Sequence, residues 1–403
     1  MSNISDYKIR HDGTLIDYIG NETEIVLPTN VKAIGNGAFK SKNIQSITIP
    51  DGVTSIGMHA FRLCRELVSI HIPNSVTSIG KGAFAECFRL ETISFPASVA
   101  TIGCHLFEDC RSLSFIDVDA ENQNFTSVDG VLLNKEKTTL ITCPAAHADS
   151  HEIPAEVTAI EEKAFCQCKM LTSINLPSGV TDIGESAFEG CENLTDINIP
   201  NGVTSIGWHA FGSCKRLKSI RIPDTVTSIG GGAFEGCISL KTINIPNGIK
   251  TIEKMTFHDC RKLKEINIPN SVTTIGYGAF HFCRSLTSIH IPDGVMSIGS
   301  WAFENCKSLE RINIPEGVTT IEQEAFKNCE KLETIHIPST VTTIERGAFS
   351  GCINLVNAVI PKEVVEIDIT AFEKCRQIKI HAAKGSFAEK YAELFGIPTV
   401  IVK

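Results

Sequence analysis

The chain has 403 residues, of which 42% are hydrophobic and 21% are charged, so it carries enough apolar side chains for a folded core. Its formal net charge of -9 gives no overall positive field, so nucleic acid and anionic lipid are not expected partners. It also lacks an apolar run of about 18 residues, the length that marks a membrane-spanning helix. Membrane insertion is therefore not expected.

The first element expected in chain order is a β-hairpin cap over residues 1–27. The segment YKIRHDGTLIDY, residues 7–18, places apolar residues on both sides of an Asp-Gly pair, which is typical of a hairpin turn. The opening residues MSNISDYKIRHDG lack the cationic start and apolar run of a secretory signal. Taken by itself, this start predicts a cytoplasmic protein.

Regularly spaced prolines show that most of the chain is a repeat. Each is followed by an apolar residue at +3, Ile at +6, usually Ala-Phe at +10 and +11, Cys at +14 and usually Leu at +17, and from Pro154 onward the interval is 23 residues. Such periodicity predicts four leucine-rich repeats over residues 28–119 and ten over residues 154–380. The prolines are Pro28, Pro50, Pro73, Pro96, Pro154, Pro177, Pro200, Pro223, Pro246, Pro269, Pro292, Pro315, Pro338 and Pro361.

One unit, PSGVTDIGESAFEGCENLTDINI at residues 177–199, shows what each position predicts. The alternation at its end predicts a short strand with Ile197 and Ile199 pointing inward, and the proline that follows ends this strand. Phe188, Cys191 and Leu194 are three apart, which matches one face of a short helical segment. Because one unit cannot bury these residues alone, neighbouring units are expected to stack into a curved α/β solenoid with a parallel strand ladder.

Two segments break the period. The interval from Pro96 to Pro154 is 58 residues, one unit plus 35, and the sequence FTSVDGVLLNKEKTTLITCP at residues 125–144 predicts a β-hairpin insertion over residues 120–153. It shares the pattern DGxL, at residues 129–132, with residues 12–15 of the N-terminal hairpin. After Cys375 the phase fails, and GSFAEKYAELFGIPTVIVK predicts a helix and a final strand within a C-terminal cap at residues 381–403.

The repeat pattern LxxIxIPxxVTxIGxxAFxxC resembles the BspA-type leucine-rich repeats of bacterial and protist surface proteins, over nearly the whole chain. The resemblance implies a solenoid used for attachment or protein binding. It also implies a protein ligand, which includes host extracellular or surface proteins, and a place at the cell surface or outside the cell. Localisation therefore stays open between this expectation and the cytoplasm.

The sixteen cysteines are interpreted as packing residues. Register in a parallel stack keeps neighbouring Cβ atoms near the ~4.8 Å strand spacing, whereas a disulfide needs about 3.8 Å, so free buried thiols are expected, and these favour a reducing environment. The off-register Cys104, Cys143 and Cys166 lack the spacing of a zinc site, so no metal is expected. Thirteen share one repeat position: Cys64, Cys87, Cys110, Cys168, Cys191, Cys214, Cys237, Cys260, Cys283, Cys306, Cys329, Cys352 and Cys375.

The sequence predicts no catalytic residue and no cofactor. Its histidines recur by repeat position and accompany no nucleophile motif, and its glycines belong to repeat turns and form no phosphate-binding loop. His258 and His281 lie one repeat apart, but two ligands are too few for a closed zinc site. The only irregular place for an enzyme site is the hairpin insertion near residues 120–150, which keeps an enzyme as an alternative.

The candidate binding surface is the outward side of the strands before the prolines. The residues two and four before each proline point to one solvent face. Larger side chains stand among small polar neighbours there, and charge changes sign along the row five before each proline, which can orient a partner. The first set is Arg221, Asn244, Asn267, His290, Arg311 and His336, and the second is Lys218, Lys241, Lys264, Thr287, Glu310 and Glu333.

A second candidate surface is formed by Trp208, Tyr277 and Trp301, which lie just before the Ala-Phe pairs. Aromatic residues are enriched in binding hot spots, but these three can also simply cover neighbouring repeats. The polar rows can likewise serve only to keep the strand face soluble.

These observations favour a non-enzymatic recognition or adhesion protein whose ligand lies across the strand face. The alternative is an intracellular scaffold for protein assembly. The sequence leaves the ligand, the organism and the oligomeric state open.

Overall fold

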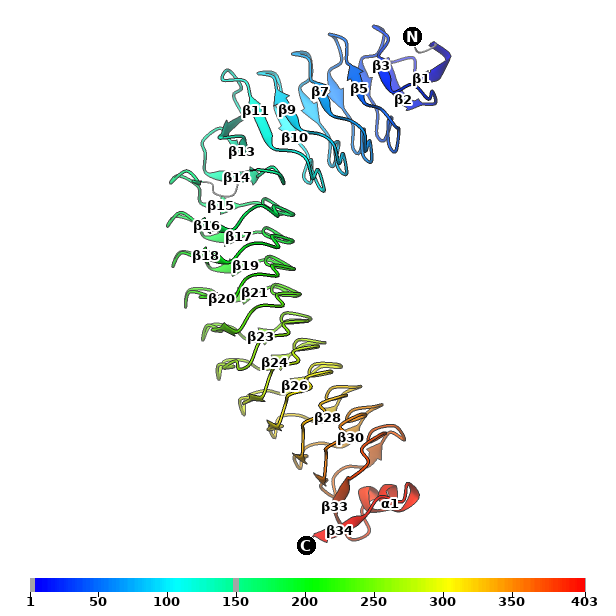
Figure 1. The fold of residues 1–403 in the computed structure, drawn as a ribbon, viewed down its shortest axis with the longest axis vertical. Coiled ribbons are helices and arrows are strands. Elements are labelled where there is room, and N and C mark those ends of the chain that lie inside the picture. The colour runs from blue at the N-terminus through cyan, green and yellow to red at the C-terminus, as the bar shows by residue number, and fades with distance from the viewer. Residues whose placement is uncertain (1–3, 148–151, 403) are drawn as a thin grey trace. The chain divides into compact units, whose positions relative to one another are not determined.

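The computed structural model describes residues 4–147 and 152–402. It is a β-solenoid of about 17 turns with parallel strand ladders and very little helix (Figure 1). The chain divides into unit 1, Met1–Asn193, and unit 2, Leu194–Lys403. A 3-10 turn at Ile4–Asp6 precedes the first strand.

In unit 1 the four repeats before the insertion each contribute one short strand after the proline to a six-stranded sheet, which begins with the N-terminal hairpin. β1 and β2 pair antiparallel, and the later strands pair parallel with equivalent residues opposite each other, as Ser55 lies opposite Ser78. The strands in spatial order are β1 (Tyr7–Ile9), β2 (Thr14–Tyr18), β4 (Ala33–Ile34), β6 (Ser55–Ile56), β8 (Ser78–Ile79) and β10 (Thr101–Ile102).

A second set of strands in unit 1 precedes the prolines, except β11, which precedes Asp119. They pair parallel in separate short sheets, β3 with β5 in one and β7, β9 and β11 in another. Their inward side chains are buried and their outward ones exposed, as in Ser69, Ile70 and His71. This alternation is the one that the sequence predicts. The strands are β3 (Glu24–Val26), β5 (Ser46–Thr48), β7 (Ser69–His71), β9 (Thr92–Phe95), β11 (Phe115–Val118) and β16 (Ser173–Asn175).

In each hairpin of unit 1, the last strand also pairs parallel with the first strand of the repeats that follow. β2 of the N-terminal hairpin pairs parallel with β4, and the last strand of the inserted hairpin, β14, pairs parallel with β15. Within the insertion β13 pairs antiparallel with β12 and β14. The bounds are β12 (Phe125–Val128), β13 (Val131–Asn134), β14 (Thr139–Thr142), β15 (Ala159–Ile160) and β17 (Asp182–Ile183).

Unit 2 continues the same two kinds of strand. After the prolines come β19 (Ser205–Ile206), β21 (Ser228–Ile229), β23 (Thr251–Ile252), β24 (Thr274–Ile275), β26 (Ser297–Ile298), β28 (Thr320–Ile321), β30 (Thr343–Ile344) and β32 (Glu366–Ile367). Before the prolines lie β18 (Asp196–Asn198), β20 (Ser219–Ile220), β22 (Thr242–Ile243), β25 (Ser288–Ile289), β27 (Arg311–Ile312), β29 (Thr334–His336) and β31 (Asn357–Val359). β33 (Lys379–Ala383) pairs parallel with β31 but is not followed by a repeat proline.

In each repeat, the residues that follow the strand after the proline form hydrogen-bonded turns. This corrects the expectation of short helical segments. The Cys191 amide donates to the Phe188 carbonyl at 3.2 Å, and Glu189 donates in the same way to Ser186 at 3.1 Å. Ser186 and Gly190 have φ angles of 52° and 73°, in the left-handed region. A right-handed helix cannot pass through such residues, so each turn ends before it becomes a helix.

The core is a stack of Phe rings with a row of Cys beside it. In unit 2 the rings from Phe211 to Phe372 stack with centroids 5.3–5.7 Å apart. The Phe211 carbonyl accepts the amide of Cys214, 3.2 Å away in its own repeat, and the thiol of Cys237, 3.2 Å away in the next. Each Cys therefore fills a small apolar position and also satisfies a buried carbonyl.

The C-terminal cap consists of the helix α1 (Phe387–Leu394) and the strand β34 (Thr399–Val402), which pairs parallel with β33. The Ser386 hydroxyl accepts the Glu389 amide, which caps the start of α1. Tyr391 of α1 lies buried at the end of the ring stack, 6.1 Å from Phe372 in edge-to-face geometry. The helix thus closes the core of unit 2.

Candidate functional site

The strand face of unit 2, defined here as the outward residues of the strands before its prolines, presents the predicted polar row. Arg221, Asn244, Asn267 and His290 are exposed, and so are Arg311 and His336. Parallel bridges join Asn244 to Asn267 and Asn267 to His290, and Ser288 lies opposite Arg311. Equivalent positions of successive repeats are therefore side by side, about 4.8 Å apart at the backbone.

Shallow grooves on this face bring some of these side chains together. Arg221 and Asn244 line one groove, together with Asp224. Asn267 and His290 line a second groove. His290 also lines a third, with Arg311. His336 lies farther along the same row, in β29.

Asn244 has a structural role that the sequence does not reveal. Its amide donates to the Ile222 carbonyl at 2.7 Å and its oxygen accepts the Ile222 amide at 2.9 Å. Asn313 binds the backbone of Ile291 with the same two distances. These side chains replace ladder hydrogen bonds between strands, so the amide of Asn244 is already occupied within the fold.

The row five residues before each proline runs along the side of the strand face in backbone register. The Thr287 amide donates to the Lys264 carbonyl at 3.1 Å, and the Glu310 amide to the Thr287 carbonyl at 2.9 Å. All three side chains are exposed, as are Lys241 and Glu333. The predicted change of sign therefore lies on a single exposed row.

The second candidate surface lies on the loop edge. We use this name for the turns between the strand after each proline and the Cys of the same repeat. The Trp208 ring is 39% exposed, lies 4.8 Å from Lys254 Nζ, and covers Gly231 of the next repeat. Tyr277 is also 39% exposed and packs on Trp301, with ring centroids 4.9 Å apart. Each aromatic residue thus covers a neighbouring repeat, which is the simpler of its two interpretations.

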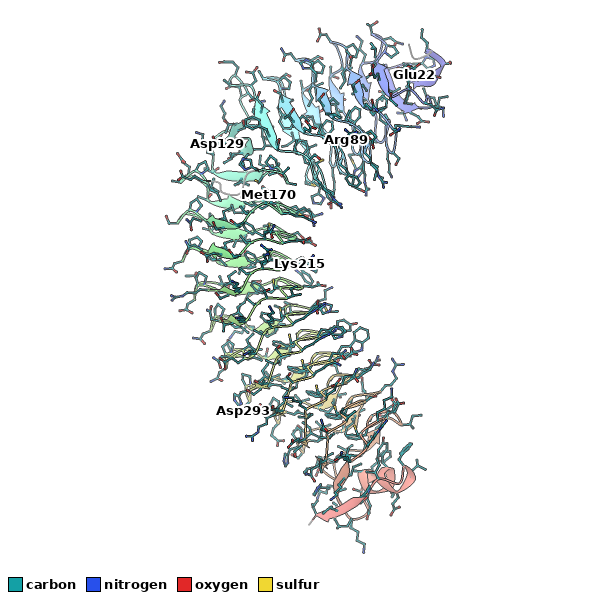
Figure 2. All side chains as sticks on the ribbon, in the orientation of Figure 1. Glu22, Arg89, Asp129, Met170, Lys215 and Asp293 are labelled. Atoms are coloured by element: carbon teal, nitrogen blue, oxygen red, sulfur yellow. The ribbon has the colours of Figure 1, made fainter. Side chains whose placement is uncertain are left out.

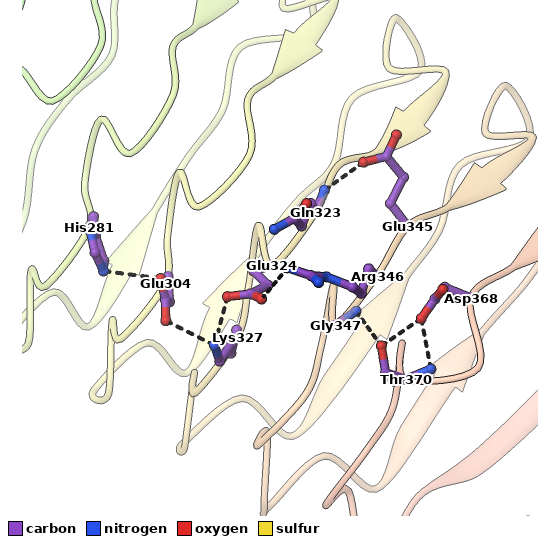
Figure 3. A network of polar contacts seen from close by, with 10 residues as sticks. All are labelled: His281, Glu304, Gln323, Glu324, Lys327, Glu345, Arg346, Gly347, Asp368 and Thr370. Carbon is purple, nitrogen blue, oxygen red and sulfur yellow. Dashed lines mark hydrogen bonds and ion pairs between the residues drawn. The ribbon is translucent and has the colours of Figure 1, made fainter.

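Charged side chains link successive repeats along the same edge (Figure 3). Glu304 lies 3.1 Å from His281 Nε2 and 3.4 Å from Lys327 Nζ, and Lys327 lies 2.6 Å from Glu324. Burial raises the pKa of Glu304, but its contacts with His281 and Lys327 outweigh this effect, so the pKa lies below its usual value. The sequence does not reveal this network, because His281, Glu304 and Lys327 come from three successive repeats.

His258 and His281 do come together, with stacked rings 4.9 Å apart. His258 Nδ1 lies 3.3 Å from Glu235, and Glu235 lies equally close to His209 Nδ1. No cluster of three or more metal-binding side chains occurs in residues 4–147 and 152–402. The pair therefore belongs to the loop-edge network.

The opposite edges of unit 2 carry different turns. Figure 2 shows Lys215 and Asp293 on opposite edges. Lys215 follows Cys214 in the turn before a strand of the face, and Asp293 follows Pro292 in the turn after one. The strand face runs between these edges.

The hairpin insertion lies beside a cavity of about 90 Å³ in unit 1. Its lining includes residues from the segments 102–109 and 161–166. We call the contact between these two segments the junction. His105 Nε2 lies 2.6 Å from Glu162, and Lys163 Nζ lies 2.7 Å from Glu108. These four charged groups are thus paired, and burial raises the pKa of the nearby Cys166 thiol to about 12.

A family model described as the BspA type leucine-rich repeat region matches residues 17–129, 145–264 and 250–379. The chain belongs to the BspA-type leucine-rich repeat family. A leucine-rich cell surface protein from Faecalibacterium prausnitzii A2-165 is similar, with 25% identity, a TM-score of 0.51, and coverage of 97% of this chain and 96% of that one. A leucine-rich repeat protein from Bacteroides ovatus ATCC 8483 shares the fold, with 24% identity, a TM-score of 0.54 and coverage of 98% of each chain. No curated protein matches the sequence significantly.

The sixteen cysteines of this BspA-type chain form no disulfide, and the thirteen of the repeat row are buried. Burial raises the pKa of Cys237 to about 12, which keeps its thiol protonated and unreactive. Cys104 differs because it is exposed. In the described part of the chain, no helix has the length and apolarity needed to cross a membrane. Family and fold are those of repeat scaffolds.

Proposed function

We propose that the chain is a non-enzymatic scaffold that binds a protein ligand on the strand face of unit 2. The observation that carries this proposal is the exposed row in which Arg221, His290 and Arg311 rise beside shallow grooves among small polar neighbours. Charged and polar groups that project from a rigid ladder are already positioned, so a ligand binds with little loss of side-chain entropy. His336 extends the same surface by one more strand.

The ligand is a protein or another component of a host surface, and the role is adhesion. The relative from Faecalibacterium prausnitzii is named a cell surface protein and covers almost the same length, which supports this role. Leucine-rich repeat folds in general suit protein interaction. The aromatic residues Trp208, Tyr277 and Trp301 are a second contact surface.

The absence of catalysis is part of the proposal. At the cavity of unit 1, His105 is paired with Glu162 and Lys163 with Glu108, and burial keeps the Cys166 thiol protonated. A general base or nucleophile needs a free, suitably titrating group. Incubation with panels of ester, peptide and glycoside substrates should therefore give no turnover above buffer.

The test is a pull-down of candidate host proteins on the immobilised chain, compared with Arg221→Ala and His290→Ala. Loss of the same partner from both variants is expected because both side chains project from one face. Arg376→Ala is the matched control, since Arg376 is an exposed arginine in a turn away from this face. Retention of every partner by both face variants would refute the proposal.

The alternative, an intracellular assembly scaffold, is favoured by the absence of disulfides among the sixteen cysteines, because thiols persist best in a reducing compartment. Labelling of intact cells with a membrane-impermeant reagent separates the two roles. Labelled chain supports adhesion. Chain found only in the cytosolic fraction supports assembly and removes the adhesion role.

A further inference from the structure

Charges on the strand face of unit 2, and on the row that runs along its side, change sign about one central repeat. In the row five before the prolines, Lys241 and Lys264 lie on one side of Thr287, and Glu310 and Glu333 lie on the other. Thr287 is uncharged and exposed, and its backbone is hydrogen bonded to Lys264 and Glu310. Each position on one side therefore has its opposite charge at the same distance on the other.

The neighbouring row repeats the inversion with the signs exchanged. Four residues before the prolines, Glu265 precedes the central Ser288 and Arg311 follows it. Ser288 lies directly opposite Arg311 in the parallel ladder, and the bridge from Asn267 to His290 holds the preceding strand in the same register. Two independent rows thus share one centre, the strand β25.

These charges are available for an external partner. Lys241, Lys264, Glu265, Arg311 and Glu333 are exposed and form no ion pair within residues 4–147 and 152–402. Glu310 lies 3.7 Å from Lys331, but both side chains are more than half exposed, so this contact is weak. Lys241 and Lys264 are like charges in adjacent repeats, an arrangement that costs stability unless a partner neutralises it.

We propose that a second copy of this chain docks on the strand face, with its repeats running in the opposite direction. A two-fold axis parallel to β25 places each row against the same row of the partner copy and reverses the order of the repeats. Lys264 then meets Glu310, Lys241 meets Glu333, and Glu265 meets Arg311. Because the interface is isologous, each of these three pairs forms twice.

A second copy fits these charges better than a uniformly charged polymer. An anionic polymer attracted to Lys241 and Lys264 meets repulsion from Glu310 and Glu333 farther along the row. Only a partner with the reverse order of charges matches both halves, and this chain itself carries that order. The inference rests on the proposed use of the strand face for protein binding, and it names one partner of that face.

The dimer is expected to be weak and sensitive to salt. The patch spans five strands at about 4.8 Å spacing, which is small beside the ~800 Å² per partner of a stable interface. Its contacts are exposed ion pairs, which salt screens. Sedimentation velocity from about 10 μM to 1 mM at low ionic strength should show a monomer–dimer equilibrium that shifts at least tenfold toward monomer in 0.5 M NaCl.

Charge reversal gives the decisive test. Lys264→Glu places two carboxylates together at both copies of the Lys264–Glu310 pair, and Glu310→Lys places two ammonium groups together there, so each variant should dimerise at least tenfold more weakly than the wild type. An equimolar mixture of the two variants restores opposite charges at both places. The mixture should therefore dimerise like the wild type, and only as mixed pairs.

Lys218→Glu is the matched control. Lys218 is in the same row, but the two-fold axis places it against Val356, so its reversal should change dimerisation less than threefold. A chain that is monomeric up to 1 mM, or variants that fail to recover on mixing, would overturn the dimer. The two proposals can fail separately. If the chain is monomeric but Arg221→Ala and His290→Ala lose a host partner, only the dimer is refuted. If the chain dimerises but both variants keep every host partner, only ligand binding is refuted.

Discussion

At the residue scale, nine of the fourteen repeats have a glycine seven positions after the proline, and Gly80 and Gly103 show how such a glycine lies against the backbone of the preceding repeat. A Cβ on Gly80 would be 2.5 Å from the Met58 nitrogen, and one on Gly103 would be 2.2 Å from the Lys81 nitrogen. Backbone atoms cannot rotate away as a side chain can. These glycines therefore set how closely two repeats approach.

Gly80→Ala should destabilise unit 1 by about 1–3 kcal/mol, the usual cost of overpacking. Gly179→Ala is the control, because its Cβ would meet nothing closer than 3.6 Å and its φ angle is not positive. That control should be neutral or slightly stabilising. Urea denaturation followed by circular dichroism measures both, and equal midpoints for the two variants would contradict the steric argument.

Single residues also show why the sequence predicted the core better than the loops. The apolar positions of the unit at residues 177–199 recur in every repeat, so Ile197 and Phe188 could be assigned to the interior from the period alone. The left-handed positions are occupied by glycine in some repeats and by other residues elsewhere, as at Ser186 and the equivalent Gly232. That mixture hid the requirement for positive φ and made a turn resemble a helix.

The candidate site was predictable to the same extent. Period-2 geometry is enough to place Arg221 and His290 on one exposed face, and the structure has them there. The role of Asn244 was not predictable, because an amide that binds the backbone of Ile222 looks the same in sequence as one that faces solvent. The partners of His281 were hidden because they come from another repeat.

At the scale of elements, the cysteine row should be chemically silent in the folded protein. Burial raises the pKa of Cys237 to about 12, so at pH 8 only about one thiol in ten thousand is the reactive thiolate. A chromogenic disulfide reagent should label the exposed Cys104 rapidly and the buried row only after denaturation, when sixteen thiols are released. Cys104→Ser should abolish the fast phase. Rapid native labelling of several thiols would show that the row is accessible.

Glu304 is the most buried carboxylate of the loop-edge network, and it joins His281 to Lys327. Glu304→Gln should destabilise unit 2 by about 1–3 kcal/mol, because it leaves partly buried donors without their charged acceptor. Glu330→Gln is the control. It breaks the exposed pair with Lys307, and such pairs contribute about 0–1 kcal/mol. Thermal denaturation compares the two, and equal losses would show that the network contributes no more than a surface pair.

At the scale of the whole molecule, the junction is held by side chains as well as by backbone. Burial raises the pKa of Glu108, but the hydrogen bond from Lys163 and the charges of Lys163 and His105 outweigh it, so the pKa lies below its ordinary value of 4.5. A carboxylate with a lowered pKa stabilises the fold fully above its ordinary pKa and loses that contribution as pH falls through its folded value. The junction should therefore loosen in acid.

Hydrogen exchange measures this loosening. Protection of residues 102–109 and 161–166 should fall between pH 5 and 3, after correction for the intrinsic rate, more than protection of the repeats at residues 55–80. In Glu108→Gln it should already be low at pH 5 and change little below. Protection that falls equally in the wild type and the variant would remove Glu108 as the cause.

The two hairpins fix the register in which the parallel strands pair. In a nearly identical repeat, a strand that pairs one whole unit out of place loses almost no contact energy, so the repeats alone specify their alignment poorly. β2 and β14 are each joined covalently to an antiparallel partner, and each is the first strand of a parallel ladder. Their position is therefore fixed by the hairpin, and it sets the register of the strands that pair after them. A chain with one repeat removed should keep its order, whereas one without the inserted hairpin should populate slipped alignments.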